Sequence, residues 1–322
     1  MAPTPSSNPR SSARGVNDLS DQRIREEAKR AMKERGLKCV IGWNEEGTPV
    51  FAATEEELDR LSFNRRCVNN LVPYLTFEVR SQRGKTRDGK DKVVQPVGVV
   101  VRGCDSKALL LLLNENILSR GEMFIIGVPC EGVEDPRAGG ALFKKCVKCA
   151  MRNPVVSDVL ASEEVREDEK DYGEVEDIER MSPEERWALW EEILADCIRC
   201  HACKRSCPVC YCDECLLDPT DVAVRPDTTA EEKAYRPRWV ERSVNVPENL
   251  IYHLARLPHL VGRCVDCGEC ERVCPRRLPL RLLTTKLEKD VKEIFGYEAA
   301  KEAGQKPLIA MSCMDDDNGF IM

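Results

Sequence analysis

Two short stretches of the chain are almost entirely apolar, which is the pattern of strands buried on both faces. Val97–Val101 is the first and Met123–Val128 is the second, and the apolar stretch Lys107–Asn116 between them has the length of a helix. This order predicts a β-α-β unit with parallel strands and a right-handed crossover. Arg102–Ser106 is the expected turn between the first strand and the helix. We therefore expect an α/β domain in this part of the chain.

Helical periodicity dominates the ends of the chain. Ser20 is the expected N-cap of a helix over Asp21–Arg35, which Gly36 ends, and Leu37–Trp43 then has the pattern of a strand. In the second half, Ser182 and Glu185 form a capping-box pattern that starts another helix. Two further helices are expected from about Pro247 and over Pro279–Phe295. The apolar face of the helix from Pro247 is formed by Leu250, Ile251, Leu254 and Leu257.

These elements predict an α+β fold with two domains. The first is an α/β domain with a parallel β-α-β unit, and the second is mostly helical. The expected boundaries are a disordered leader at 1–19, the α/β domain at 20–160, an acidic linker at 161–180, the helical domain at 181–300 and a tail at 301–322.

Composition narrows the class of protein. The net charge of −7 argues against a non-specific nucleic-acid binder, which needs a basic surface. No apolar run is long enough to span a membrane and no secretory signal follows the first residue, so we expect a cytoplasmic protein. The chain has 18 cysteines and only 3 histidines. Without a secretory signal, such a set of thiols favours iron–sulfur chemistry over a disulfide framework.

Eight of the cysteines form two runs with identical spacing. Cys197, Cys200, Cys203 and Cys207 precede Pro208, and Cys264, Cys267, Cys270 and Cys274 precede Pro275. This is the ferredoxin pattern for 4Fe–4S clusters, in which the fourth cysteine serves the other cluster. Zinc sites use two pairs of ligands instead of three cysteines plus one, so zinc and free thiols are the weaker alternatives. The predicted ligands are Cys197, Cys200, Cys203 and Cys274 for the first cluster, and Cys264, Cys267, Cys270 and Cys207 for the second.

The insert between the two runs is long, and helices flank the second run. This arrangement resembles the α-helical ferredoxin domain of the iron–sulfur subunits of succinate dehydrogenases and heterodisulfide reductases. Several other stretches resemble ferredoxin-type subunits related to the β subunits of deazaflavin-reducing hydrogenases and formate dehydrogenases. These stretches are Cys-Val-Asn-Asn-Leu (67–71), Val-Arg-Gly-Cys-Asp-Ser-Lys-Ala (101–108), Ile-Gly-Val-Pro-Cys-Glu-Gly (126–132), Cys-Val-Lys-Cys (146–149), Asn-Pro-Val-Val-Ser-Asp (153–158) and Cys-Pro-Val-Cys-Tyr-Cys (207–212).

The resemblance implies an electron-relay subunit of an anaerobic redox complex, and it strengthens the case for further clusters. Cys104 and Cys130 end the two parallel strands and so meet at one sheet edge, with Cys104 near a helix start that stabilises a thiolate. Together with Cys146 and Cys149 they are the candidate ligands of a third cluster, with zinc or a redox-active dithiol as alternatives. Counting the remaining cysteines gives a fourth candidate set, which is Cys67, Cys210, Cys212 and Cys215. The alternative for the last three is that some of them are inert, buried thiols. Cys39 and Cys313 are set aside.

The function predicted is single-electron transfer between a flavin, dehydrogenase or hydrogenase partner and a heterodisulfide-reductase-like partner, with no substrate chemistry in this chain. The alternatives are a subunit that uses FAD to exchange hydride with a nicotinamide or deazaflavin coenzyme, and a scaffold whose clusters carry no current. The chain has no glycine-rich dinucleotide motif, which weighs against FAD. His201 is a candidate donor to a sulfur, whereas His253 and His259 are expected to pack in a helix. The expected docking rim consists of Arg263, Arg272, Arg276 and Arg277.

Overall fold

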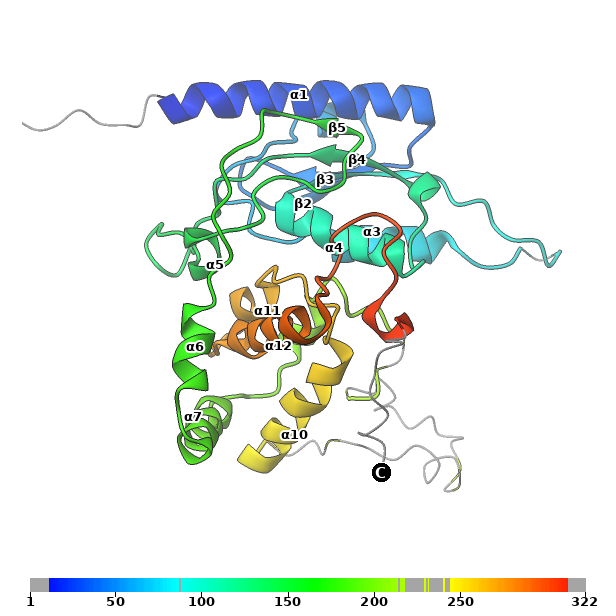
Figure 1. The fold of residues 1–322 in the computed structure, drawn as a ribbon. Helices are drawn as coiled ribbons and strands as arrows, with labels where there is room; N and C mark the ends of the chain where they lie inside the picture. The colour runs from blue at the N-terminus through cyan, green and yellow to red at the C-terminus, as the bar shows by residue number, and fades with distance from the viewer. Residues whose placement is uncertain are drawn as a thin grey trace, which may run out of the picture. The chain divides into compact units, whose positions relative to one another are not determined.

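The computed structural model describes residues 12–86, 88–213, 215–217 and 244–311, together with positions 229, 231 and 240. Cys313 and part of the predicted leader and tail lie outside these residues. The chain divides into two compact units, Met1–Lys170 and Asp171–Met322. The first contains a sheet flanked by helices, and the second is built from helices and loops (Figure 1). This content is α+β, as the sequence predicts.

A five-stranded mixed sheet forms the centre of the first unit. Its order is β2-β1-β3-β4-β5. The strands are β1 (Val40–Trp43), β2 (Pro49–Ala52), β3 (Val97–Val101), β4 (Met123–Gly127) and β5 (Val159–Leu160). β1 and β2 are antiparallel, whereas β1, β3, β4 and β5 run parallel to one another. Every residue of β3 and β4 is buried, which explains why both read as uninterrupted apolar runs.

Helices cover both faces of this sheet. α1 (Ser12–Arg35) lies along one face, while α3 (Val72–Gln82) and α4 (Gly103–Asn114) lie on the other (Figure 1). α4 connects β3 to the parallel strand β4, so the predicted β-α-β unit is confirmed. The remaining helical segments of this unit are α2 (Glu55–Leu58), the 3-10 turn Arg120–Glu122 and α5 (Lys144–Val147).

Three local predictions for the first unit are wrong. α1 begins at Ser12, inside the predicted leader, so Ser20 lies within the helix and does not cap it. The strand predicted from Leu37 begins at Val40. The expected turn over Arg102–Ser106 is the first turn of α4, because Asp105 closes a capping box with the backbone N–H of Arg102.

The second unit consists of short helices joined by cysteine-bearing loops. They are α6 (Gly173–Glu179), α7 (Pro183–Ala195), α8 (Ala202–Arg205), α10 (Val246–Arg256), the 3-10 turn Leu257–His259, α11 (Glu269–Arg272), α12 (Leu280–Phe295) and the 3-10 turn Leu308–Ala310. Ser182 and Glu185 form the predicted capping box at the start of α7. Gly296 ends α12 with a left-handed φ of 60°.

Part of the predicted acidic linker is a helix that is held in place. α6 lies within it, and Glu179 at the end of α6 forms ion pairs with Lys286 and Lys289 of α12 at 2.7 and 2.5 Å. These two ammonium groups lower the pKa of the Glu179 carboxyl to about 2. The segment therefore carries charge that fastens one helix of the second unit to another.

Candidate metal centres

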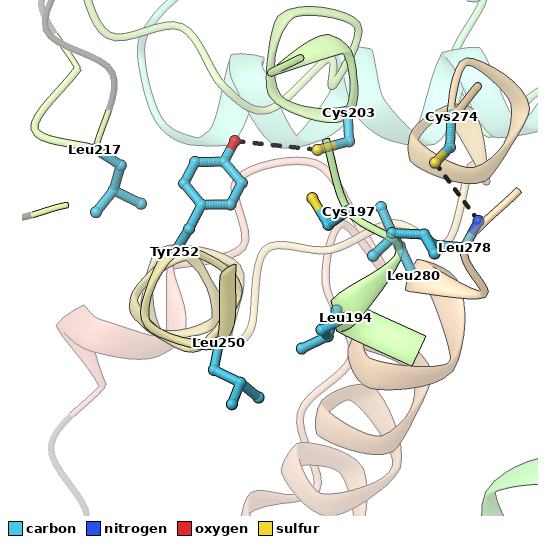
Figure 2. Packing of buried hydrophobic residues seen from close by; sticks show 9 residues of the cluster. All are labelled: Leu194, Cys197, Cys203, Leu217, Leu250, Tyr252, Cys274, Leu278 and Leu280. Carbon is cyan, nitrogen blue, oxygen red and sulfur yellow. Dashed lines mark hydrogen bonds between the residues drawn. The ribbon is translucent and has the colours of Figure 1, made fainter. Parts of the chain in front are cut away.

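The four cysteines predicted for the first cluster line one pocket. Cys197, Cys200 and Cys203 come from the loop after α7 and from α8, and Cys274 comes from the loop after α11. Figure 2 shows Cys197 and Cys203 between α10 and the segment that carries Cys274. The fourth cysteine of the second run therefore lies with the first three cysteines of the first run, which is the crossed arrangement that the ferredoxin spacing leads one to expect.

The two runs fold into loops with the same backbone conformation. The second residue after the first cysteine is left-handed in both, with φ of 47° at Arg199 and 52° at Asp266. The fourth residue after it is left-handed as well, with φ of 59° at His201 and 68° at Gly268. Each loop then enters a single helical turn, α8 or α11, that carries the third cysteine. Identical spacing thus gives identical local structure, and the turns aim backbone N–H groups at the thiols.

Several backbone amides donate hydrogen bonds to cysteine sulfurs. The N–H of Arg199 donates to Cys197 Sγ at 3.4 Å, and the N–H of Leu278 donates to Cys274 Sγ at 3.5 Å. In the second run the N–H of Asp266 donates to Cys264 in the same way. Such donors stabilise negative charge on a ligand sulfur, and in iron–sulfur proteins they tune the reduction potential.

α10 turns a polar face toward the first pocket. Asn249, Tyr252, His253 and Arg256 are buried, whereas Ile251 and Leu254 are 46% and 51% exposed. The prediction that the apolar residues form the packing face is therefore wrong for Ile251 and Leu254. Helical spacing places the four polar residues on one side of the helix. A buried polar face needs hydrogen-bond partners, and here the partners belong to the first cysteine run.

Each polar residue of α10 contacts this run. The Asn249 amide donates to the carbonyl oxygens of Leu194 and Cys197 at 3.0 and 2.8 Å, which holds the end of α7. The Tyr252 hydroxyl lies 4.0 Å from Cys203 Sγ, and the ring points from α10 toward that sulfur (Figure 2). His253 Nε2 lies 3.3 Å from Cys197 Sγ. The helix therefore supplies two side chains that face sulfurs of the predicted ligand set.

His253 is a residue whose role sequence analysis missed, since it was expected only to pack. Burial, with a smaller contribution from the charge of Arg256, lowers the pKa of its imidazole to about 4. The ring is thus neutral near pH 7 and carries one N–H, which donates to a thiolate when it is on Nε2. The signal in the sequence is the polar series at positions 249, 252, 253 and 256, which follows helical spacing. His201, the histidine singled out instead, stacks edge-on against the Tyr252 ring at 5.0 Å.

The thiols predicted for the second cluster are also close to one another. Cys270 interacts electrostatically with Cys264 and Cys207, and all three residues are partly buried. Cys267 belongs to the same loop and is 9% exposed. Burial raises the pKa of the Cys264 thiol to about 11. Before metal binds, this thiol is therefore protonated at neutral pH, and ligation must displace its proton.

The donor set fits a 4Fe–4S cluster better than a single metal ion. Within the described residues, no three histidine, cysteine, aspartate or glutamate side chains are arranged to hold one ion. A cubane keeps its four thiolates apart by its own width, so its ligands surround a space instead of converging on a point. The thiols around the first pocket, with N–H donors aimed at two of them, have this form.

Three additional thiols follow the first run. Cys210 contacts the Cys207 thiol and the guanidinium of Arg256, and these contacts lower its pKa to about 7 although burial opposes this. Cys212 is exposed and Cys215 is partly buried. Cys67, the fourth member of the predicted set, lies in the first unit, where its sulfur accepts a hydrogen bond from the N–H of Asn64 at 3.3 Å. The fourth set thus draws on both units and stays a prediction.

In the first unit, thiols gather at the end of the parallel strands. Cys130 interacts electrostatically with Cys104, Cys146 and Cys67, while Cys149 does so with Arg152. Cys130 and Cys146 pack in one small cluster with Val133 and Phe143. Burial and the neighbouring Asp105 raise the pKa of Cys104 well above its usual range. Both effects oppose the stabilisation of the Cys104 thiolate that is expected from the helix start, and that expectation stays a prediction.

A buried ion pair supports this edge of the sheet. The Arg102 guanidinium pairs with both carboxylate oxygens of Asp105 at 2.8 and 3.0 Å, and the two side chains are 2% and 0% exposed. Arg102 also donates to the backbone carbonyl oxygens of Cys67 and Asn69 at 2.7 and 3.0 Å. The pair therefore joins the segment of Cys67 to the segment of Cys104.

The predicted docking rim is not a row of unpaired cations. Arg272 pairs with Glu269 at 2.8 Å, and Arg276 pairs with Asp196 at 2.9 Å. Arg263 donates to the carbonyl oxygen of Val209 at 3.1 Å and lies over the Tyr211 ring. The two ion pairs lower the net positive charge that the rim offers to a partner.

The fold and the two cysteine loops define an iron–sulfur electron-transfer protein. Residues 193–278 match the family model of the 4Fe-4S dicluster domain. The chain is also 30% identical over 120 residues to the F420-dependent formate dehydrogenase subunit beta of Methanocaldococcus jannaschii. This match covers 37% of this chain and 27% of that protein. It is 28% identical over 124 residues to the F420-dependent formate dehydrogenase 1 subunit beta of Methanococcus maripaludis, with 38% of this chain and 27% of that protein covered.

These similarities confirm the resemblance to β subunits of formate dehydrogenases. The matches span about a quarter of the length of each of these relatives, at 27% in both cases. Among the described residues, no helix has both the length and the apolar character needed to cross a lipid bilayer.

Proposed function

We propose that this chain is an electron-relay subunit of a multi-subunit redox complex and that its second unit binds two 4Fe–4S clusters. Cys197, Cys200, Cys203 and Cys274 hold one cluster, and Cys264, Cys267, Cys270 and Cys207 hold the other. The pocket lined by the first four thiols is the observation that carries the proposal. When bound, a 4Fe–4S cluster accepts and releases one electron at a time.

The contribution of the protein is to position and stabilise charged sulfurs. The amides of Arg199 and Leu278 donate to the thiolates of Cys197 and Cys274. His253 and Tyr252 add side-chain donors from α10. Burial of Cys197 and Cys203, which are both 8% exposed, excludes water from the sulfurs. Each of these effects adjusts the reduction potential, which decides the direction of electron flow.

We propose a third site in the first unit, with Cys104, Cys130, Cys146 and Cys149 as its ligands. The proximity of Cys130 to Cys104 and Cys146 supports it. The fourth set of Cys67, Cys210, Cys212 and Cys215 is a weaker proposal, because the neighbour of Cys67 is Cys130. The partners proposed are a flavin-bearing subunit and a heterodisulfide-reductase-like subunit, between which the clusters pass electrons in the cytoplasm.

The similarity to F420-dependent formate dehydrogenase β subunits favours a second candidate function. In it, the chain binds FAD and exchanges hydride with a deazaflavin or nicotinamide coenzyme. One experiment separates the two. The native complex is purified anaerobically, and its iron, sulfide, flavin and subunits are determined. Iron and sulfide without flavin on this chain support the relay, whereas flavin bound to this chain and turnover of a coenzyme by it alone support the flavoenzyme.

A further inference from the structure

Arg256 of α10 is a buried cation. It is 6% exposed and lies in the last turn of α10. Other arginines of the unit pair with acids, as Arg281 does with Asp266 and Arg199 with Glu248, but no carboxylate of the described residues pairs with Arg256. A buried charge is strongly destabilising unless an opposite charge or several hydrogen bonds compensate it.

The hydrogen bonds of Arg256 do not provide this compensation. Its Nη2 donates to the backbone carbonyl oxygen of Cys203 at 3.0 Å. Its Nε atom is buried and has no hydrogen-bond partner among the described residues. The guanidinium also contacts the Cys210 thiol. Within the described residues the guanidinium thus lies among cysteine sulfurs, which can supply the negative charge.

The thiols around Arg256 come from both cysteine runs. Although burial opposes the charged form, Cys207, Cys203, Cys210 and Cys270 raise the pKa of the guanidinium when they are thiolates. Cys203 belongs to the ligand set proposed for the first cluster, while Cys207 and Cys270 belong to the set proposed for the second. The two sets therefore share one cation.

We propose that Arg256 is the common counter-charge of the two cluster sites and sets the reduction potential of both. This inference rests on the proposed function, because it needs two clusters in the second unit. Arg256 is a positioning residue: it ligates nothing and acts through the charge that it holds beside the sulfurs. A buried cation stabilises the reduced, more negative form of a nearby cluster, since the surrounding protein screens charge less than water does.

The experiment is a redox titration of the full chain, reconstituted anaerobically and followed by electron paramagnetic resonance. Arg256→Gln removes the charge and keeps an amide that can donate to the Cys203 carbonyl. We expect the midpoint potentials of both clusters to shift to more negative values. Arg256→Lys keeps the charge and is expected to return both potentials toward those of the wild type.

Arg276→Gln is the matched control. The Arg276 side chain is 49% exposed, pairs with Asp196, and lines the first pocket. Because water screens its charge, we expect a smaller shift, and in no more than one potential. A shift in both potentials with Arg256→Gln but not with Arg276→Gln supports the shared counter-charge.

Three results would overturn the inference. The first is two intact clusters in Arg256→Gln with unchanged potentials, and the second is a shift in one potential only. The third concerns assembly: if Arg256→Gln loses its clusters, Arg256→Lys must restore them, and loss in both variants means that the arginine has only a packing role. A wild-type chain that binds no pair of clusters overturns the proposed function itself, and iron and sulfide analysis identifies this case before any variant is compared.

Discussion

His253 Nε2 lies 3.3 Å from Cys197 Sγ, although 56 positions of sequence separate the two residues. α10 makes this contact because its polar side, not its apolar side, faces the first cysteine run. The side chain that faces this predicted ligand sulfur therefore comes from a helix that carries none of the predicted ligands.

Replacement of His253 by Phe is expected to make the potential of one cluster more negative. The change removes an N–H donor to the Cys197 sulfur, and such a donor stabilises the reduced cluster. Redox titration of the full chain measures the effect. His259→Phe is the control, because His259 is exposed. Equal potentials in the two variants would show that the His253 contact has no electronic role.

Replacement of Cys207 by Ser is expected to alter the cluster held by Cys264, Cys267 and Cys270. Cys207 is the last cysteine of the first run, but its thiol interacts with those of Cys264 and Cys270. The comparison variant is Cys274→Ser, which should alter the other cluster. Magnetic resonance spectra of the two variants should therefore differ from the wild type in different signals. If each substitution changed the cluster of its own run, the crossed assignment would be wrong.

Replacement of Cys146 by Ser is expected to lower the iron content of the full chain by about four atoms, one cubane. It removes a thiol that packs with Cys130 at the end of the parallel strands. Cys39→Ser is the comparison, because Cys39 is buried beside β1 and belongs to no proposed set. An unchanged iron content in the folded Cys146 variant rules out the third site.

Gly103→Ala is expected to destabilise the first unit by about 1–3 kcal/mol, the usual cost of an overpacked site. A Cβ atom at Gly103 would lie 2.2 Å from the backbone carbonyl oxygen of Met151, and neither backbone can move without disturbing the strand ends. Gly121→Ala meets no atom within 4 Å and serves as the control. Chemical denaturation of both variants measures the difference. Equal stabilities of the two variants would mean that the backbones at Gly103 and Met151 lie farther apart than in this structure.

The parts of the fold that follow from local sequence were predictable. Val97–Val101 and Met123–Val128 read as buried strands because both faces of a parallel strand are covered. The cysteine loops were predictable as well, because the spacing of the cysteines alone determines the turn that each loop makes. β5 was missed because Val159–Leu160 is too short to give a periodic signal.

The parts that depend on distant contacts were not predictable. From sequence, the apolar residues of α10 fit a packing face as well as its polar residues do. Which face is buried depends on the loop of the first cysteine run against which the helix packs. The same holds for Arg256, whose neighbours come from both runs. From sequence alone, a buried polar face of a helix cannot be distinguished from a solvent-exposed one, because periodicity carries no information about the residues that pack against that face.

The measurement that tests the central claim most directly is iron and acid-labile sulfide analysis of the full chain after anaerobic purification. Two 4Fe–4S clusters in the second unit require at least about eight iron atoms and as many sulfides per chain, with signals that disappear and return on reduction and oxidation. About four iron atoms, or zinc without sulfide, would contradict the account.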